Sequence, residues 1–369
     1  MKINFFQTSV NQDEIDAVVK VMESWMIVEW NEVRKLENDF NKYISDNKYH
    51  PIAVSNGTVS LDLALKALGI NENHEVIVPD FTFIATSNSV LFQKAKVIFS
   101  DVEKDTYNIS LDDIKSKTTE STKAIIIVHL FGRPVENIQE IVTFCTENNI
   151  FLIEDCAQAH WAEINNKKIW SFGDASCFSF YATKNMCTAE GWMTLFKNQD
   201  IYKKAKLIYN HGQSEKYLHT ALGYNFRMTN IQAAIWNVQL NKIDLLNTQR
   251  IENASIYNEI LKEQKIIQLP KEIVNGKNVF HQYTLLVKEN SPISRDQLME
   301  KLSNAWIPTA IHYPYPIHKQ PYYIELGYSE NICPQSTYLS ENIFSLPIYP
   351  GLEKEKIEYI AHTLLKLLK

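Results

Sequence analysis

The feature that most constrains the fold is a regular alternation of strand-like and helix-like segments in the first half of the chain. Short apolar runs at residues 75–79, 96–102, 123–131 and 151–155 are separated by segments with helical spacing at residues 85–92, 111–117 and 136–147. Connections of this kind build a mostly parallel sheet with helices on both faces. The sequence therefore predicts an α/β fold, preceded by two helices between residues 12 and 43.

Two strand-like runs end near residues that could carry out chemistry. FLIED ends on Glu154 and Asp155, and the apolar run of residues 177–181 precedes Lys184. Because ligands of open α/β sheets bind beyond the carboxyl ends of strands, we expect both acids and Lys184 in one crevice. A desolvated amine has a lowered pKa and can attack a carbonyl as the free base. Pyridoxal phosphate needs such a pair, a lysine for its aldehyde and an acid for its ring nitrogen. Taken alone, an acid after a strand is also typical of a helix cap or a turn.

A phosphate site is predicted where the stretch SNGTVSL opens a helix. Gly57 and Thr58 begin this helix, whose free N–H groups and positive dipole end suit a phosphate. Taken alone, these two residues are an ordinary helix start. Together with Ser179 and Lys184 they predict a phosphate cup. Neither GxxxxGK[ST] nor GxGxxG occurs, which argues against a P-loop or a nicotinamide enzyme.

Five motifs, in order, carry a family resemblance. SNGTVSLDLALKALGI, EVIVPDFTFIATSNSVL, EDCAQAH, SFYATKN and LGYNFRMTNIQAA resemble the DegT/DnrJ/EryC1/StrS family of pyridoxal-phosphate-dependent sugar aminotransferases. The similarity runs over nearly all of the chain. It implies PLP-dependent transferase fold type I, an α/β fold with a mostly parallel central sheet flanked by helices and a smaller α/β C-terminal domain. We expect a large PLP-binding domain at residues 1–246 and a small domain at residues 247–369.

The resemblance also implies roles for individual residues. The catalytic pair would be Lys184, bound to the cofactor aldehyde, and Asp155, paired with the ring nitrogen. The remaining cofactor contacts would be Gly57, Thr58 and Ser179 at the phosphate, Phe83 and Gln158 at the ring, and Asn225 from the partner subunit of a homodimer with shared active sites. The substrate contacts would be Arg227, His312 and Tyr313, the last two at the end of a strand. A dimer-interface salt bridge for Arg227 and a satisfied interdomain histidine for His312 are alternatives.

The function implied is transfer of an amino group, with glutamate as the donor, to a 3- or 4-keto sugar attached to a nucleotide. Such a reaction serves amino-sugar or surface-polysaccharide biosynthesis. One alternative is a PLP-dependent sugar dehydratase of the same fold, in which histidine replaces the lysine; the presence of Lys184 argues against it. Another is a noncatalytic regulatory protein of this fold, because fold does not fix function.

Composition and charge exclude other classes. The formal net charge of −6 argues against a nucleic-acid or membrane-surface partner. No apolar run reaches the ~18 residues that span a bilayer, and the amino terminus lacks the apolar stretch of a signal peptide. We therefore expect a cytoplasmic protein. The five cysteines show no paired CxxC spacing, which favours reduced thiols and no metal site.

The seven tryptophans are the one oddity of composition. All stand where the family's pattern ordinarily shows glycine: Trp25, Trp30, Trp161, Trp170, Trp192, Trp236 and Trp306. The clearest is Trp192, since EGWM stands where the family reads EGGM. The hypothesis is that UGA codons, which specify glycine in the source, are read here as tryptophan. The alternative is real divergence at seven positions.

Overall fold

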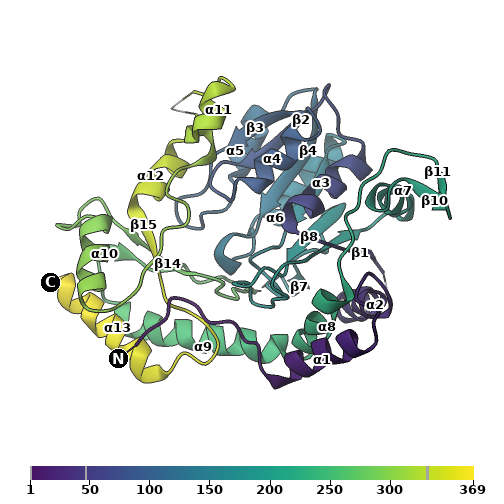
Figure 1. Cartoon of the computed structure of the whole chain (residues 1–369). Helices are drawn as coiled ribbons and strands as arrows, with labels where there is room; N and C mark the ends of the chain where they lie inside the picture. The colour runs from purple at the N-terminus through teal and green to yellow at the C-terminus, as the bar shows by residue number, and fades with distance from the viewer. Residues whose placement is uncertain (1, 46–47, 330–331) are drawn as a thin grey trace.

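The computed structural model describes residues 2–45, 48–329 and 332–369, and a seven-stranded sheet lies at its centre (Figure 1). The strands are β1 (His50–Val54), β2 (Glu75–Pro79), β3 (Lys96–Ser100), β4 (Thr122–Val128), β5 (Phe151–Asp155), β8 (Ala175–Ser179) and β9 (Trp192–Phe196). Their order is β1-β9-β8-β5-β4-β2-β3. Neighbouring strands are parallel except where β9 pairs with β1 and β8. The other six strands therefore end at one common edge of the sheet.

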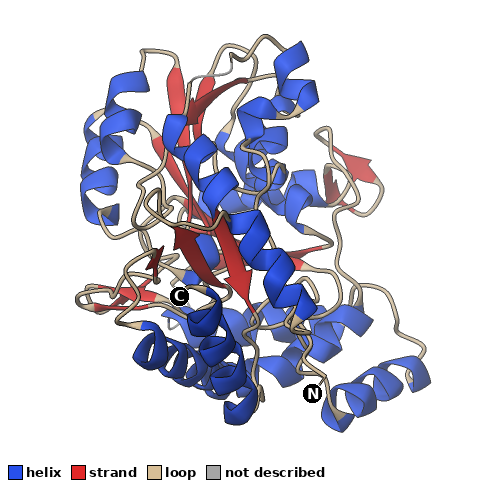
Figure 2. Cartoon of the chain, turned by 90° about the vertical axis from the view of Figure 1, so that its left-hand side faces the viewer, coloured by secondary structure: helices blue, strands red, loops and turns tan. Residues whose placement is uncertain are grey.

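Helices cover both faces of this sheet, as the alternating pattern predicts (Figure 2). They are α2 (Asn31–Ser45), α3 (Gly57–Leu68), α4 (Ala85–Leu91), α5 (Leu111–Lys117), α6 (Ile138–Glu147), α7 (Gln199–Tyr209) and α8 (Asn230–Gln239). Helix α1 (Gln12–Glu23) packs on α8. Successive strand residues face opposite layers, so Ile126 packs in the α3 cluster while Ile125 and Ile127 pack with residues of α6. The predicted fold class is confirmed.

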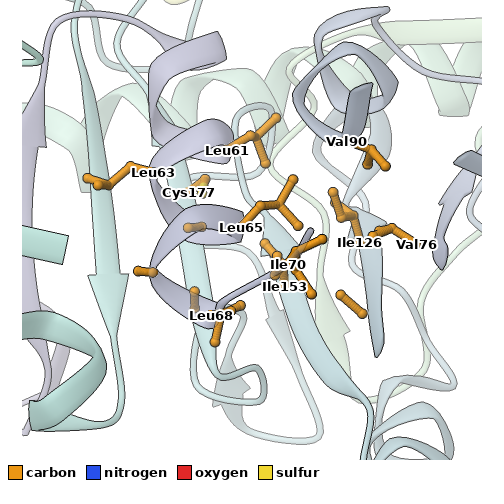
Figure 3. Close-up of a cluster of buried hydrophobic side chains, with 14 of the residues drawn as sticks. Leu61, Leu63, Leu65, Leu68, Ile70, Val76, Val90, Ile126, Ile153 and Cys177 are labelled. Carbon is orange, nitrogen blue, oxygen red and sulfur yellow. The ribbon is translucent and has the colours of Figure 1, made fainter. Parts of the chain in front are cut away.

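Helix α3 is held tightly against the sheet by its apolar face. It begins after Asn56, whose side chain accepts a hydrogen bond from the Val59 N–H at 3.2 Å. Figure 3 shows Leu61 and Leu65 projecting from α3 into the buried cluster beside the strands. Each buried leucine contributes about 1.5–3 kcal/mol relative to an exposed one. This packing fixes the start of α3 just beyond the end of β1, at the common edge.

A second, smaller layer forms the C-terminal part. It consists of α9 (Ile243–Leu261), β12 (Ile267–Gln268), β14 (Tyr283–Val287), α10 (Arg295–Asn304), β15 (Ile343–Leu346) and α13 (Lys354–Leu367). Strands β12, β14 and β15 make an antiparallel sheet, and α13 packs beside α9. The predicted domain division at residues 246 and 247 falls inside α9 and stays a prediction.

Shorter elements connect these layers. They are η1 (Leu130–Gly132), β6 (Glu163–Ile164), β7 (Lys167–Lys168), β10 (Gln213–Glu215), β11 (Leu218–His219), η2 (Leu240–Lys242), β13 (Gly276–Lys277), η3 (Ile317–Lys319), α11 (Pro321–Glu325) and α12 (Pro334–Asn342). The segment with η3 and α11 returns to the central sheet, where the Tyr323 hydroxyl donates to Ser87 Oγ at 2.6 Å. No helix in the described ranges is long and apolar enough to cross a membrane. The five cysteines are buried and free.

Two local predictions are wrong. The strand expected to run through residue 181 ends at Ser179, because the chain turns into a loop whose Phe180 N–H donates to Gly191 O at 2.7 Å. His312 and Tyr313 do not end a strand. Only Ala310 pairs, in an isolated bridge with Ser345, and the proline-rich segment that follows lacks regular structure.

Arg250 of α9 joins the layers and gives a stability prediction. It is 3% exposed, and its Nη1 donates to the carbonyl oxygens of Phe280, His281 and Ile348 at 3.3, 3.4 and 3.0 Å. Arg250→Met should lower the free energy of unfolding by about 2–3 kcal/mol, because buried carbonyls lose their donor. Urea denaturation measures this, with exposed Glu252→Met on the same helix as control. A loss below about 0.5 kcal/mol would contradict the assigned role.

Candidate active site

A cavity of about 900 Å³ opens at the common carboxyl edge of the sheet. Nine of the predicted site residues line it: Gly57, Thr58, Phe83, Asp155, Gln158, Ser179, Lys184, His312 and Tyr313. They come from the ends of β1, β2, β5 and β8 and from the C-terminal part of the chain. The cavity lies where the parallel sheet predicts a ligand site.

Lys184 lies at the tip of the loop that follows β8. The Lys184 backbone N–H donates to Tyr181 O at 2.9 Å. The side-chain amide of the neighbouring Asn185 donates to Asn247 Oδ1 and to Val279 O at 2.8 and 3.0 Å. The loop is thereby fixed to α9 and to the C-terminal part. The side chain is partly accessible only because it lines the cavity, and the surrounding protein lowers its pKa to about 8 by desolvation. More of the amine is therefore free base near neutral pH than in an exposed lysine.

Asp155 ends β5 and faces the same cavity. Its Oδ1 accepts the Ala157 N–H at 3.0 Å, and the residue is 5% exposed. Burial raises the pKa of this carboxyl to about 6, against the opposing effects of the Ala157 hydrogen bond and the Lys184 charge. In turn, the Asp155 charge raises the pKa of Lys184 against desolvation. The two groups therefore lie in one crevice, as the sequence predicts, and the charge of each affects the pKa of the other.

Glu154 does not belong to the site, so its expected place in the crevice is wrong. Neighbouring strand residues point to opposite faces of a sheet, and Glu154 points away from the cavity. Its carboxylate accepts the backbone N–H groups of Trp170, Phe172 and Gly173 at 2.7–2.9 Å and lies 3.2 Å from His129 Nε2. Glu154 is a buried structural acid that holds the loop before β8.

The end of the cavity where the sequence predicts a phosphate is formed by the start of α3 and the end of β8. Gly57 and Thr58 are the first residues of α3, whose first N–H groups have no partner within the helix. Ser179 is 1% exposed, and its Oγ accepts the Tyr181 N–H at 3.3 Å. Trp192 also lines this end, and its indole lies against Gly57.

Gln158 and Tyr313 are linked across the ring end of the cavity. Gln158 donates to the Tyr313 hydroxyl at 3.1 Å, and its Oε1 accepts the Phe131 N–H at 2.9 Å. The Phe83 ring lies 6.3 Å from that of Tyr313. His312 Nδ1 is buried without a hydrogen-bond partner in the part of the chain that the structure describes. Burial and the Lys184 charge lower the pKa of His312 to about 4, which keeps it neutral.

Asn225 and Arg227 are not among the residues that line this cavity. Asn225 is exposed and forms an isolated bridge with Asn210, whose side chain accepts from Arg227 Nη1 at 2.5 Å. Arg227 Nε lies 3.8 Å from Glu29. The predicted roles of Asn225 and Arg227 toward a partner subunit stay predictions.

Some crevice residues were not predicted. Tyr181 and Glu190 flank the Lys184 loop, and His281 and Gln282 reach the crevice from the segment before β14. His281 Nδ1 lies 3.3 Å from Asn185 Oδ1, next to the lysine. The pattern of apolar residues carries no signal for a contact between segments a hundred residues apart.

These residues fit pyridoxal phosphate. Helix N–H groups and Ser179 suit its phosphate, Asp155 suits its ring nitrogen, and the unpartnered His312 Nδ1 leaves a polar atom free for a ligand. A desolvated lysine and a buried carboxylate in one crevice, at the carboxyl edge of a parallel sheet, are the groups that a pyridoxal-phosphate-dependent enzyme needs.

The particular family follows from comparison with known proteins. The model of the DegT/DnrJ/EryC1/StrS aminotransferase family matches residues 8–365, so the chain belongs to this family. The predicted family, enzyme class and cofactor are thereby confirmed: the protein is a pyridoxal-phosphate-dependent aminotransferase.

Relatives and solved structures agree with this. GDP-perosamine synthase of Escherichia coli O157:H7 is 35% identical over 366 residues, covering 98% of this chain and 97% of that protein. UDP-N-acetyl-3-dehydro-alpha-D-glucosamine 3-aminotransferase of Acidithiobacillus ferrooxidans is 35% identical over 352 residues, covering 95% and 92%. The structure of DesV from S. venezuelae, in complex with a ketimine intermediate, matches with a TM-score of 0.91 at 27% identity and covers 97% and 95%.

The coupling of Lys184 and Asp155 predicts a pH dependence. Covalent capture of pyridoxal phosphate by the apoprotein should speed up as pH rises and level off above about 8, because only the free amine attacks. In Asp155→Asn the midpoint of this curve of capture rate against pH should move to lower pH, since the carboxylate that raises the Lys184 pKa is gone. Timed borohydride reduction followed by mass measurement gives the rate.

Glu190→Gln is the matched control for this shift. Glu190 lines the same crevice but is not among the groups that shift the Lys184 pKa, so its midpoint should stay where it is. A midpoint that stays in place in Asp155→Asn, or moves to higher pH, would contradict the coupling.

Proposed function

We propose that the protein transfers an amino group from glutamate to a 3- or 4-keto sugar carried on a nucleotide, for amino-sugar or surface-polysaccharide biosynthesis. The single observation that carries the proposal is the coupled Lys184 and Asp155 pair in one cavity of a chain from this family. The relatives named above, which act on sugar nucleotides by their names, support the substrate class. The expected cytoplasmic location stays a prediction.

The residues of the cavity have separate tasks in such a reaction. Pyridoxal phosphate supplies an aldehyde that exchanges amines and a ring that accepts the electrons of a broken C–H bond. Lys184 Nζ would hold the aldehyde carbon until the donor amine takes its place there, and the released Lys184 amine would then remove and return a proton at the substrate carbon. Asp155 would keep the ring nitrogen protonated. Gln158 and Tyr313, joined by their hydrogen bond, keep the ring end of the cavity in a fixed shape.

The alternatives receive less support. A dehydratase of this fold has histidine in place of the lysine, and here Lys184 lies in the cavity with a lowered pKa. A noncatalytic regulator would not need a desolvated amine coupled to a carboxylate. Both alternatives remain distinguishable by the donor reaction described next.

The donor half of the reaction gives a direct prediction. Holoenzyme mixed with glutamate, without any sugar, should release about one equivalent of 2-oxoglutarate per chain, because the amino group stays on the enzyme. Lys184→Ala should release almost none, a loss of more than ~100-fold, while still binding the cofactor noncovalently. Enzymatic determination of 2-oxoglutarate measures both. If the holoenzyme releases no 2-oxoglutarate from glutamate but releases a keto acid from another amino acid, that amino acid replaces glutamate as the donor.

We also propose that two copies share their active sites. The first residues of the chain expose a series of apolar side chains that suit burial against a second copy: Val10, Ile15, Val19, Met22, Ile27 and Val28. The segment with Asn225 and Arg227 lies outside its own cavity, so its predicted role requires a partner. The alternative for Arg227 is an ion pair, of which the 3.8 Å contact with Glu29 is an example within the chain.

Mixed dimers provide the test of shared sites. Lys184→Ala and Arg227→Ala should each have little activity alone. Dimers of one copy of each should regain one intact site, built from the unmodified lysine of one copy and the unmodified arginine of the other. Turnover of a co-expressed, doubly tagged mixture measures this. Lys184→Ala and Asp155→Asn form the control pair, because both side chains line the cavity of the same copy and no mixed dimer restores them together. If purified mixed dimers show no rescue, Arg227 acts in the same active site as Lys184 of its own copy, and the proposal of shared sites is contradicted.

A further inference from the structure

Tryptophan in this chain occupies backbone conformations that suit glycine. Four of the seven tryptophans have a left-handed φ: Trp25 (62°), Trp161 (67°), Trp170 (75°) and Trp306 (59°). In the described ranges only fifteen non-glycine residues have a positive φ at all, whereas six of the ten glycines do. Residues with a Cβ avoid this region, which glycine enters freely. In their backbone geometry, these tryptophans resemble the glycines of the same chain.

The end of α10 shows this at a helix terminus. The Trp306 N–H donates to Ser303 O at 2.9 Å, and the next residue, Ile307, donates to Leu302 O at 3.0 Å. Helix α3 ends with the same two bonds, and there the left-handed residue is Gly69. This is the Schellman arrangement, in which that position is usually glycine. The Trp306 side chain is 81% exposed, so no burial compensates for the strained backbone.

Trp170, one of these four, and Trp236 carry unsatisfied polar atoms in the core. Trp170 and Trp236 are 1% and 0% exposed, and neither Nε1 has a hydrogen-bond partner in the described part of the chain. A buried indole N–H normally finds an acceptor. Trp30 stands at the N-cap of α2, where the Arg34 N–H donates to its carbonyl at 3.2 Å, another position that favours glycine over large side chains.

At the active site, Trp192 lies on the start of α3. A Cβ atom at Gly57 would lie 2.2 Å from both Cε2 and Cζ2 of the indole, so the ring is packed directly on the Gly57 backbone. Trp192 pairs with Ser179 on one side and with Val54 on the other. The indole thus lies on the start of the helix that would bind a phosphate, and its strand position is paired with Ser179.

We propose that all seven positions carry glycine in the functional protein, because the codon read as tryptophan is decoded as glycine in the source. Ten glycines in 369 residues is well below the usual ~7%, in keeping with missing glycines. We further propose that glycine at position 192 is a cofactor-positioning residue that leaves the phosphate end of the crevice open. This second part rests on the cofactor site described above, and neither part depends on which sugar is the substrate.

The decoding is tested by the intact mass and the peptide masses of the protein purified from its source organism. We expect the mass of the seven-glycine chain and glycine in each of the seven peptides. Tryptophan in these peptides would overturn the proposal.

The role of position 192 is tested by pyridoxal phosphate binding to recombinant chains. Trp192→Gly should lower the dissociation constant at least about tenfold. Trp306→Gly is the matched control, because it relieves the same kind of backbone strain far from the crevice; it should raise the melting temperature and leave the dissociation constant unchanged. If the tryptophan-containing chain does not fold, the seven-glycine chain is compared with a six-glycine chain that keeps only Trp192. Equal affinities in either comparison would overturn the role of position 192.

These tests are separate from those of the amino donor. A seven-glycine chain that binds pyridoxal phosphate tightly but releases no 2-oxoglutarate from glutamate would contradict the proposed donor and support the role of position 192. If chains with tryptophan and with glycine at position 192 turn over glutamate equally well and bind the cofactor with equal affinity, the result supports the proposed donor and contradicts the role of position 192.

Discussion

The site depends on one interaction, the electrostatic coupling of Lys184 and Asp155 in one crevice. Burial disfavours the charged form of each group, so the lysine pKa falls to about 8 and the aspartate pKa rises to about 6. Each charge opposes the shift of the other, because the Asp155 charge raises the Lys184 pKa and the Lys184 charge lowers the Asp155 pKa. Removing either one would leave the other buried and uncompensated, which is the costly outcome for a buried pair.

The two halves of the pair are positioned by different parts of the fold. Asp155 is fixed by the parallel sheet, since β5 lies between β4 and β8 and its apolar residues are covered on both faces. Lys184 is fixed by the loop after β8, through the hydrogen bonds of Asn185 to Asn247 and Val279. Because Asn247 belongs to α9, the geometry of the lysine depends on how the C-terminal layer packs against the sheet. The crevice is therefore completed only when both layers are folded.

The sequence predicted the parts of this arrangement that depend on local pattern. Strands β4 and β5 are buried on both faces, and their near-continuous apolar sequences predict this burial. The sequence prediction failed at Glu154, because the pattern of apolar residues shows that two acids stand at the strand end but does not show which face of the sheet each acid occupies. It also failed at His312 and Tyr313, where prolines limit pairing to a single bridge at Ala310. His281 could not be predicted, since its contact with Asn185 joins distant segments.

The distribution of strain separates two explanations for the seven tryptophans. Strain that serves function concentrates at active sites, where the surrounding structure holds unfavourable conformations in place. Here it occurs after α1 at Trp25, after α10 at Trp306 and in the core at Trp170, far from one another and mostly far from the crevice. What these positions share is the residue type. A common cause that acts on the residue type, before folding, explains them together, whereas independent selection at each position would have to choose the same unsuited side chain every time.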